Sequence, residues 1–186
     1  RQLQQRDFVG RLRAILAQHP LVSSGSLELE VLETSALEDI SGVTHVIEQC
    51  RLMGVLFALD DFGTGYSSLN YLKRLPVARI KIDQSFVRDM LDDPDDLAIL
   101  QGVIGLARAF KREVIAEGVE TVAHGSALLQ LGCELAQGYG IGKPLPGPEL
   151  LLWAQRWRAD PAWVRALGQQ PVPSSADSMT SVETVS

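Results

Sequence analysis

Hydrophobic residues recur along the chain with two spacings, one typical of helices and one typical of strands. Apolar side chains three and four positions apart predict amphipathic helices, whereas short apolar or alternating runs bounded by Gly, Pro or Asp predict strands. We therefore expect helices at residues 7–18, 35–53, 67–75, 95–111 and 122–131, and a last helix that begins at residue 148. We expect strands at residues 27–31, 55–59, 79–83, 113–116 and 134–137.

This order of one helix followed by five strand–helix units predicts an α/β fold with a parallel sheet. Two architectures fit it, an open doubly wound sheet and most of a (β/α)8 TIM-like barrel. A complete barrel needs eight strands and about 250 residues, so a barrel made from this chain would be partial. Residues 1–168 form the predicted domain. Residues 169–186 hold few large apolar side chains, and we expect them to be a disordered tail.

The composition limits the kinds of partner that the chain can bind. The 186 residues are 46% hydrophobic and 22% charged, which is ordinary for a globular protein, and the formal net charge is −6. A negative net charge argues against binding to polymeric nucleic acid, which needs a basic surface to neutralise phosphates. A small phosphorylated ligand held through metal ions stays compatible with it. No stretch has the length of a membrane span, and Cys50 and Cys133 are expected in the core.

Every predicted strand has a polar group at or directly after its carboxyl end, where parallel α/β folds place their active sites. In chain order they are Glu30, the pair Asp60 and Asp61, Lys81 with Asp83, Glu117, and Gln137. One acid in such a place is usually a turn or cap residue, and one lysine is usually solvated. Five successive strands that end in this way favour a shared site.

Asp60 and Asp61 form the centre of the predicted site. Adjacent residues of a strand point to opposite faces, so both carboxylates reach one centre only if the strand breaks there. Gly63 and Gly65 make such a break feasible, because glycine adopts unusual backbone angles. Carboxylates are the ligands that Mg²⁺ and Mn²⁺ prefer, and two such ions can stabilise the attacking and leaving oxygens of a phosphoester displacement. Lys81 would add positive charge for the phosphate or orient the attacking water.

Other acids have an ordinary structural explanation at helix starts. Glu33 and Glu120 each lie where a helix is expected to begin, and an acid there interacts favourably with the helix dipole. Ser35 and Glu38 have the spacing of a capping box, which predicts that the second helix begins at Ser35.

Five motifs occur in an order that resembles one known family. They are L-E-L-E-V-L-E at 27–33, D-D-F-G-T-G-Y-S-S at 60–68, K-I-D-Q-S-F-V at 81–87, A-E-G-V-E-T at 116–121 and A-Q-G-Y at 136–139. From its start to about Trp157 the chain resembles the EAL family of cyclic di-GMP phosphodiesterases. The resemblance implies a modified (β/α)8 barrel and hydrolysis of cyclic di-GMP to linear pGpG with Mg²⁺ or Mn²⁺. It also implies a cytoplasmic location, because that is where this bacterial messenger acts.

The resemblance implies roles for the residues at the strand ends. Four acids match metal ligands of the family, namely Glu30, Asp60, Asp61 and Glu117. Asp60 matches the ligand that bridges both ions. Lys81 and Gln137 match residues beside the attacking water, and Glu117 matches a glutamate proposed as ligand or general base.

The resemblance also implies accessory residues. Glu33 matches the glutamate that holds the loop after Asp61, and Asp83 and Glu120 match acidic positions of the site. Residues 62–68 match a loop that couples metal binding to dimerisation, so we expect a homodimer. The loop residues that we single out are Gly63, Thr64, Gly65 and Ser67.

Two departures from the family bear on activity. Leu32 stands where the family usually has Thr, which removes a hydroxyl. The Glu of the family's naming motif and the Asn of an N-x-S motif, both metal ligands, have no counterpart here. We therefore expect that about three strands of the barrel are missing, that dimerisation or strand swapping completes it, and that this chain alone hydrolyses cyclic di-GMP weakly or not at all. The alternative is a degenerate, non-catalytic module that binds cyclic di-GMP or a protein.

Overall fold

The computed structural model describes residues 3, 5, 7–64 and 69–168. The strands are β1 (Glu28–Leu32), β2 (Leu56–Phe62), β3 (Arg79–Ile82), β4 (Glu113–Ala116) and β5 (Leu135–Ala136). The helices are α1 (Phe8–Gln18), the 3₁₀ turn η1 (Ser24–Ser26), α2 (Glu33–Glu38), α3 (Ile40–Arg51), α4 (Leu69–Arg74), α5 (Gln84–Asp89), α6 (Pro94–Ala109), α7 (Val122–Gln130), α8 (Gly147–Arg156) and α9 (Pro161–Gly168). Within these residues no helix is both long enough and apolar enough to cross a membrane. The predicted tail, residues 169–186, lies outside the described residues.

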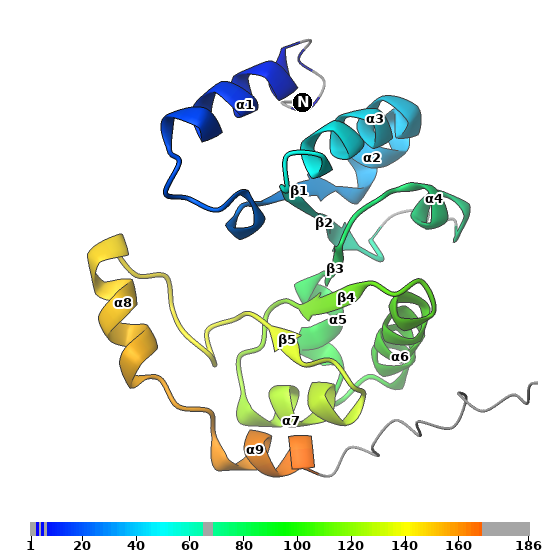
Figure 1. The fold of residues 1–186 in the computed structure, drawn as a ribbon. Helices are drawn as coiled ribbons and strands as arrows, with labels where there is room; N and C mark the ends of the chain where they lie inside the picture. Colours follow the sequence, from blue (N-terminus) through cyan, green and yellow to red (C-terminus); the bar gives the residue numbers. More distant parts are fainter. Residues whose placement is uncertain (1–2, 4, 6, 65–68, 169–186) are drawn as a thin grey trace, which may run out of the picture.

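The described strands form one parallel sheet in the order β1-β2-β3-β4-β5 (Figure 1). Each strand pairs with the next strand of the sequence. A doubly wound sheet reverses its strand order at a switch point, and this sheet has no reversal. The sequential order agrees with the wall of a (β/α)8 barrel. Among the described strands β1 and β5 are the two edges, so the wall is open.

Alternation along the strands gives the sheet two different faces. One face is apolar and contains Phe57, Leu59, Ile80 and Ile82, none of which is more than 1% exposed. Helices α3 and α6 pack against this face, so it forms the main core. The residues between them point to the opposite face, which carries the charged groups of the candidate site.

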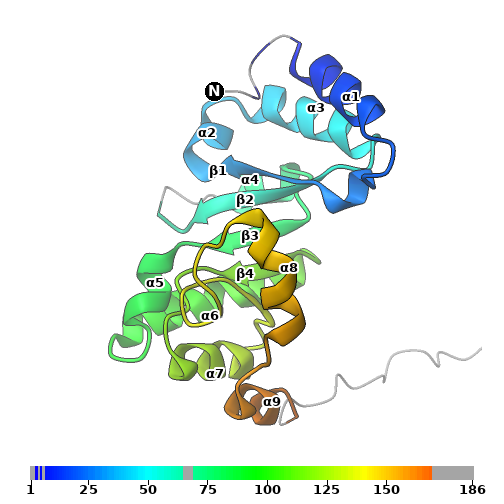
Figure 2. The same ribbon diagram turned by 90° about the vertical axis from the view of Figure 1, so that its left-hand side faces the viewer.

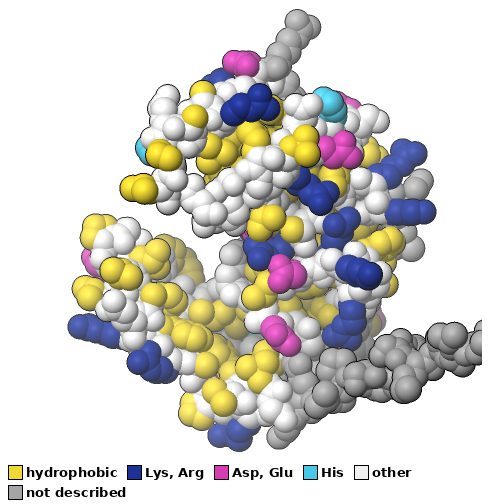
Figure 3. All heavy atoms as spheres, in the orientation of Figure 1, with side chains coloured by type: hydrophobic (Ala, Val, Ile, Leu, Met, Phe, Trp, Pro, Cys, Tyr) yellow, Lys and Arg dark blue, Asp and Glu magenta, His cyan; other side chains and the backbone are white. Residues whose placement is uncertain are grey.

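Helix α8 lies on the other side of the sheet from α6 (Figures 1 and 2). Leu150, Leu151 and Leu152 of α8 are each more than half exposed. Hydrophobic side chains cover α8 in the space-filling view, and the surface is hollowed between α8 and the part that holds α1 (Figure 3). The charged face of the sheet therefore borders an open hollow.

The predicted helix at residues 35–53 is wrong in one respect, because it is two helices. Asp39 interrupts the helical conformation between α2 and α3, since its backbone angles are φ −147° and ψ 75°. Its carboxylate accepts a hydrogen bond of 2.9 Å from the N–H of Gly42. Aspartate is a strong N-cap, so the second helix begins after Asp39. The predicted capping box of Ser35 and Glu38 does not form, since α2 already begins at Glu33.

Three short elements in the second half of the domain differ from prediction. Helices α5 and α9 were not predicted, because six and eight residues show too little periodicity. Strand β5 has two residues instead of four. Trp157 follows the last residue of α8 as its C-cap, and its indole N–H donates to the carbonyl of Ile141 at 3.0 Å.

Candidate functional site

A bulge in β2 brings two carboxylates to one place. Asp60 and Asp61 lie together opposite the single residue Lys81 of β3, because the strand register shifts between Leu59 and Phe62. Asp61 has a φ of 55°, a left-handed conformation that Asp tolerates better than most residues. The predicted break in the strand is therefore confirmed.

Lys81 lies at the centre of the acids from three strands. Its Nζ lies 2.7 Å from Oε1 of Glu30, 2.8 Å from Oδ1 of Asp60 and 2.6 Å from Oε1 of Glu117. Lys81 is 4% exposed, so it is not the solvated lysine that single lysines usually are. Burial by itself lowers its pKa, but the hydrogen bonds to Asp60, Glu117 and Glu30 outweigh burial and hold the pKa well above the usual value. The ammonium is therefore charged at every ordinary pH.

Two acids of the cluster, Glu117 and Asp61, have a pKa above the ordinary carboxyl value. Burial raises the pKa of Glu117, and Lys81 offsets only part of that effect. Burial, and then the charges of Asp60 and Asp83, raise the pKa of Asp61. Burial is the main cause of both shifts, and the charges of neighbouring acids add to it.

Three of the acids can share a metal ion. Carboxylate oxygens of Asp60, Asp61 and Glu117 all lie within 4.8 Å of one another. Hard oxygen donors with excess negative charge fit Mg²⁺ or Mn²⁺. Glu30 joins this cluster through Lys81, and its side chain is half exposed. The residues present therefore fit the predicted metal, with Glu30 at the margin.

A buried glutamate holds the loop that follows β2. The side chain of Glu33 is fully buried, and its Oε2 accepts a hydrogen bond of 3.0 Å from the N–H of Gly63. Thr64 donates from Oγ1 to the carbonyl of Asp61 at 2.9 Å. The loop thus begins with a fixed geometry directly beside Asp61. The other two predicted loop residues, Gly65 and Ser67, lie outside the described residues.

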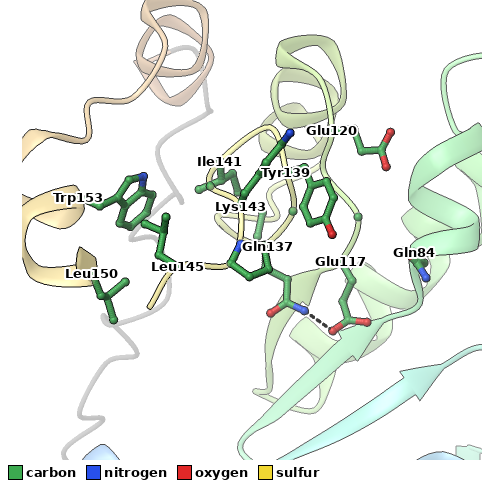
Figure 4. A pocket seen from close by; sticks show the side chains of 15 residues that line it. Gln84, Glu117, Glu120, Gln137, Tyr139, Ile141, Lys143, Leu145, Leu150 and Trp153 are labelled. Atoms are coloured by element: carbon green, nitrogen blue, oxygen red, sulfur yellow. Dashed lines mark hydrogen bonds between the residues drawn. The ribbon is translucent and has the colours of Figure 1, made fainter. Parts of the chain in front are cut away.

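Of the remaining predicted site residues, one contacts Glu117, one caps a helix and one lines a cavity. Gln137 donates from Nε2 to Oε1 of Glu117 at 2.6 Å (Figure 4). Asp83 caps α5 by accepting from the N–H of Ser85 at 2.9 Å, while its charge still acts on Asp61. Glu120 lines the cavity beside Glu117.

A cavity of about 730 Å³ opens next to Glu117 and Gln137. Its wall includes groups that the sequence patterns did not identify, namely Gln84, Tyr139, Lys143 and Trp153 (Figure 4). Nζ of Lys143 lies 5.9 Å from the centre of the Tyr139 ring. The Gly-Tyr-Gly sequence after β5 was a signal for Tyr139, but Trp153 reaches the cavity only because α8 folds back across the sheet.

Asp61→Asn should stabilise the metal-free chain. The folded chain binds the Asp61 proton more tightly than the unfolded chain, so the ionised carboxylate costs stability as pH rises through its folded pKa. Asparagine removes this charge and still tolerates a positive φ. We expect Tm to rise by roughly 1–3 °C at pH 7, because Asp61 is partly solvated, and the gain to vanish below about pH 4.

The control for this change is Asp92→Asn, which removes an exposed acid from the loop after α5. Thermal melts of both variants without metal, from pH 4 to pH 8, make the comparison. A lower Tm for Asp61→Asn than for the unchanged chain at pH 7 would contradict the crowding of charge at this site.

The comparisons with known proteins agree on one family. Residues 1–144 match the family model described as the EAL domain. The chain is 44% identical over 144 residues to the bifunctional diguanylate cyclase/cyclic di-GMP phosphodiesterase MucR of Pseudomonas aeruginosa, a match that covers 77% of this chain and 21% of MucR. It is 40% identical over 156 residues to the cyclic di-GMP phosphodiesterase NbdA of the same organism, covering 84% of this chain and 20% of NbdA. The chain thus spans about a fifth of the length of these relatives.

Solved structures show the same fold. The phosphodiesterase of Pseudomonas aeruginosa MucR in complex with c-di-GMP matches with a TM-score of 0.77 and 41% identity, over 80% of this chain and 60% of that one. A manganese/c-di-GMP complex of BlrP1 from Klebsiella pneumoniae matches with a TM-score of 0.70 and 31% identity, over 77% of this chain and 36% of that one.

Proposed function

The chain belongs to the EAL domain family of cyclic di-GMP phosphodiesterases, and from this premise we propose that it hydrolyses cyclic di-GMP to linear pGpG. The observation that carries the proposal is the convergence of Glu30, Asp60 and Glu117 on Lys81, with Asp61 brought beside them by the bulge in β2. Several acids held close together are costly when they are largely buried, as Asp60 and Glu117 are, and a metal-assisted phosphoester site is a chemistry that uses such a group.

Asp60, Asp61 and Glu117 are the residues that would hold Mg²⁺ or Mn²⁺, with Glu30 as a further ligand. The chemistry that bound ions supply is stabilisation of charge on the phosphate and easier ionisation of water. The solved structures of BlrP1 that contain c-di-GMP together with manganese or calcium support the choice of a divalent cation.

Glu117 is suited to accept the proton of the attacking water. Its carboxylate lies at the end of β4 beside Asp60 and Asp61, and a carboxylate is a common general base. The hydrogen bond from Gln137 fixes the carboxylate orientation. As the water oxygen bonds to phosphorus, the bond from phosphorus to the ribose 3′ oxygen breaks. That oxygen becomes the 3′ hydroxyl of pGpG by taking up one proton, which balances the proton that the water gives to Glu117. Lys81 stabilises the negative charge that develops on the phosphate.

The cavity beside Glu117 is the proposed place for the rest of the ligand. Its volume of about 730 Å³ lies in the range of small-molecule sites. The exposed ring of Tyr139 offers a stacking surface for a base, and Lys143 offers a positive charge for a phosphate. Homodimer formation, and completion of the barrel by a second copy, stay predictions.

An assay with an excess of the chain over cyclic di-GMP tests the proposal, because it registers even slow hydrolysis. We expect Mn²⁺-dependent conversion to pGpG, and a loss of roughly 100-fold or more in Asp60→Asn. Asp92→Asn, away from the site, should match the unchanged chain. Binding of cyclic di-GMP, measured by calorimetry in the same samples, separates a failure of catalysis from a failure of binding.

A non-catalytic cyclic di-GMP-binding module is the second candidate. The observation that favours it is the position of Lys81, whose ammonium already occupies the centre of the acids. In that case calorimetry detects cyclic di-GMP without any conversion, and Mn²⁺ changes neither result. Absence of both binding and conversion would overturn both candidates.

A further inference from the structure

A second ion cluster lies on the charged face of the sheet, one layer from the strand ends. Arg79 of β3 contacts acids of two other strands, with Nη1 at 2.6 Å from Oε2 of Glu28 and Nε at 2.8 Å from Oε2 of Glu113. The side chains of Arg79 and Glu28 are 27% and 23% exposed, so this contact is largely screened from solvent. None of the three residues of this second cluster was predicted as part of the site.

The second cluster repeats the arrangement around Lys81. Arg79 lies two residues before Lys81, and Glu28 lies two residues before Glu30, so each pair shares one face of its strand. Glu113 is the first residue of β4, and Glu117 directly follows its last residue, Ala116. In both layers a cation of β3 therefore joins an acid of β1 to an acid at one end of β4.

Both ion pairs toward β1 pass over β2, and Ala58 leaves room for them. Ala58 is in register with Glu30 on one side and with Arg79 on the other, and it is fully buried. Its side chain is a single methyl group, so it does not separate Glu28 from Arg79 or Glu30 from Lys81. The forked guanidinium directs different nitrogens to the two acids, which the single ammonium of a lysine does less well.

We infer that Arg79 is a positioning residue, which fixes β1 and β4 against β3 so that Glu30 and Glu117 lie at the metal-binding centre. Arg79 touches neither the acids of that centre nor the cavity, and it acts through the strands that carry them. The inference rests on the proposed metal-dependent function. It extends the site by one layer, to Glu28, Arg79 and Glu113.

The test measures Mn²⁺ affinity by calorimetry, and hydrolysis of cyclic di-GMP beside it. We expect Arg79→Gln to weaken Mn²⁺ binding by about tenfold, the size typical of residues that support metal ligands, and to lower kcat with little change in KM. Arg79→Lys should recover part of the affinity. Arg88→Gln is the matched control, because it removes an arginine from an exposed pair with Asp89 at 2.9 Å.

A double-mutant cycle distinguishes positioning from general stabilisation. Glu28→Gln removes one contact of Arg79, and its effect on Mn²⁺ affinity should not add to that of Arg79→Gln. If Arg79→Gln does not fold, Glu28→Gln and Glu113→Gln each test one contact, and we expect weaker Mn²⁺ binding in both. A lower Tm with unchanged Mn²⁺ affinity overturns the inference. Absence of Mn²⁺ binding in the unchanged chain contradicts the proposed function instead.

Discussion

Lys81→Met lowers the stability of the metal-free chain by about 2–4 kcal/mol, and bound Mn²⁺ restores most of the loss. Removal of the ammonium leaves Glu30, Asp60 and Glu117 facing one another without a cation. Loss of one partner of a buried pair costs about 3–5 kcal/mol, and we expect less here because the three acids keep some solvent contact. The expected fall in Tm is roughly 5–15 °C.

The pH dependence of this effect follows from the direction of the pKa shift. The folded pKa of Lys81 is raised, so its stabilising contribution is complete below the ordinary lysine pKa of about 10.4 and is lost only at higher pH. The ammonium of Lys81 therefore contributes equally to stability throughout the range from pH 6 to pH 9. We expect the difference in Tm between the unchanged chain and Lys81→Met to stay constant over this range. Hydrolysis should fall by roughly 100-fold or more even with Mn²⁺ bound.

Lys73→Met, at the exposed end of α4, is the matched control and should change Tm by no more than about 1–2 °C. Calorimetric melts with and without Mn²⁺ compare the two variants. If Lys81→Met and the unchanged chain have the same Tm in the absence of metal, then Lys81 does not offset the negative charge of the acids, and our description of the site is wrong.

Gly138→Ala should be the most disruptive small substitution at the cavity. The residue has a φ of 155°, and a Cβ there would lie 2.3 Å from the backbone nitrogen and 2.4 Å from the carbonyl oxygen of Val119. Both atoms are backbone, so neither can rotate away. The N–H of Val119 donates to the carbonyl of Gln137 at 3.0 Å, so the clash separates the two segments that place Gln137 and Glu117.

We expect a loss of about 3 kcal/mol or more in stability, and loss of hydrolysis together with it. Gly147→Ala is the control, because a Cβ at the start of α8 meets no atom within 4 Å. Alanine there should be neutral or slightly stabilising. Denaturant melts of both variants test the expectation, and a Gly138→Ala melt within error of the Gly147→Ala melt would contradict the close backbone approach.

The pattern of hydrophobic residues was sufficient to predict five strands in the correct order, although β2 extends beyond the predicted Leu59 to Phe62 and β5 is shorter than predicted. Adjacency of Asp60 and Asp61 was sufficient to predict that β2 breaks, because side-chain direction alternates along any strand. These are local properties, and the sequence contains them directly.

Contacts between distant residues could not be predicted in this way. Burial of Lys81 among three acids depends on the order and register of four strands. Glu33 lies 30 residues from Gly63, and its position at a helix start explained it equally well. The role of Arg79 also depends on the small side chain of Ala58 in another strand. Such features follow from packing, which no local pattern records.

The central claim is that Asp60, Asp61 and Glu117 bind a divalent cation, and a crystal structure of the chain grown with Mn²⁺ tests it most directly. The account predicts an anomalous-scattering peak at about 2.0–2.3 Å from carboxylate oxygens of these three residues, with the peak absent in Asp60→Asn. Two observations in saturating Mn²⁺ would together contradict it. They are the absence of a peak near these acids, and Glu30, Asp60 and Glu117 still at hydrogen-bonding distance from Lys81.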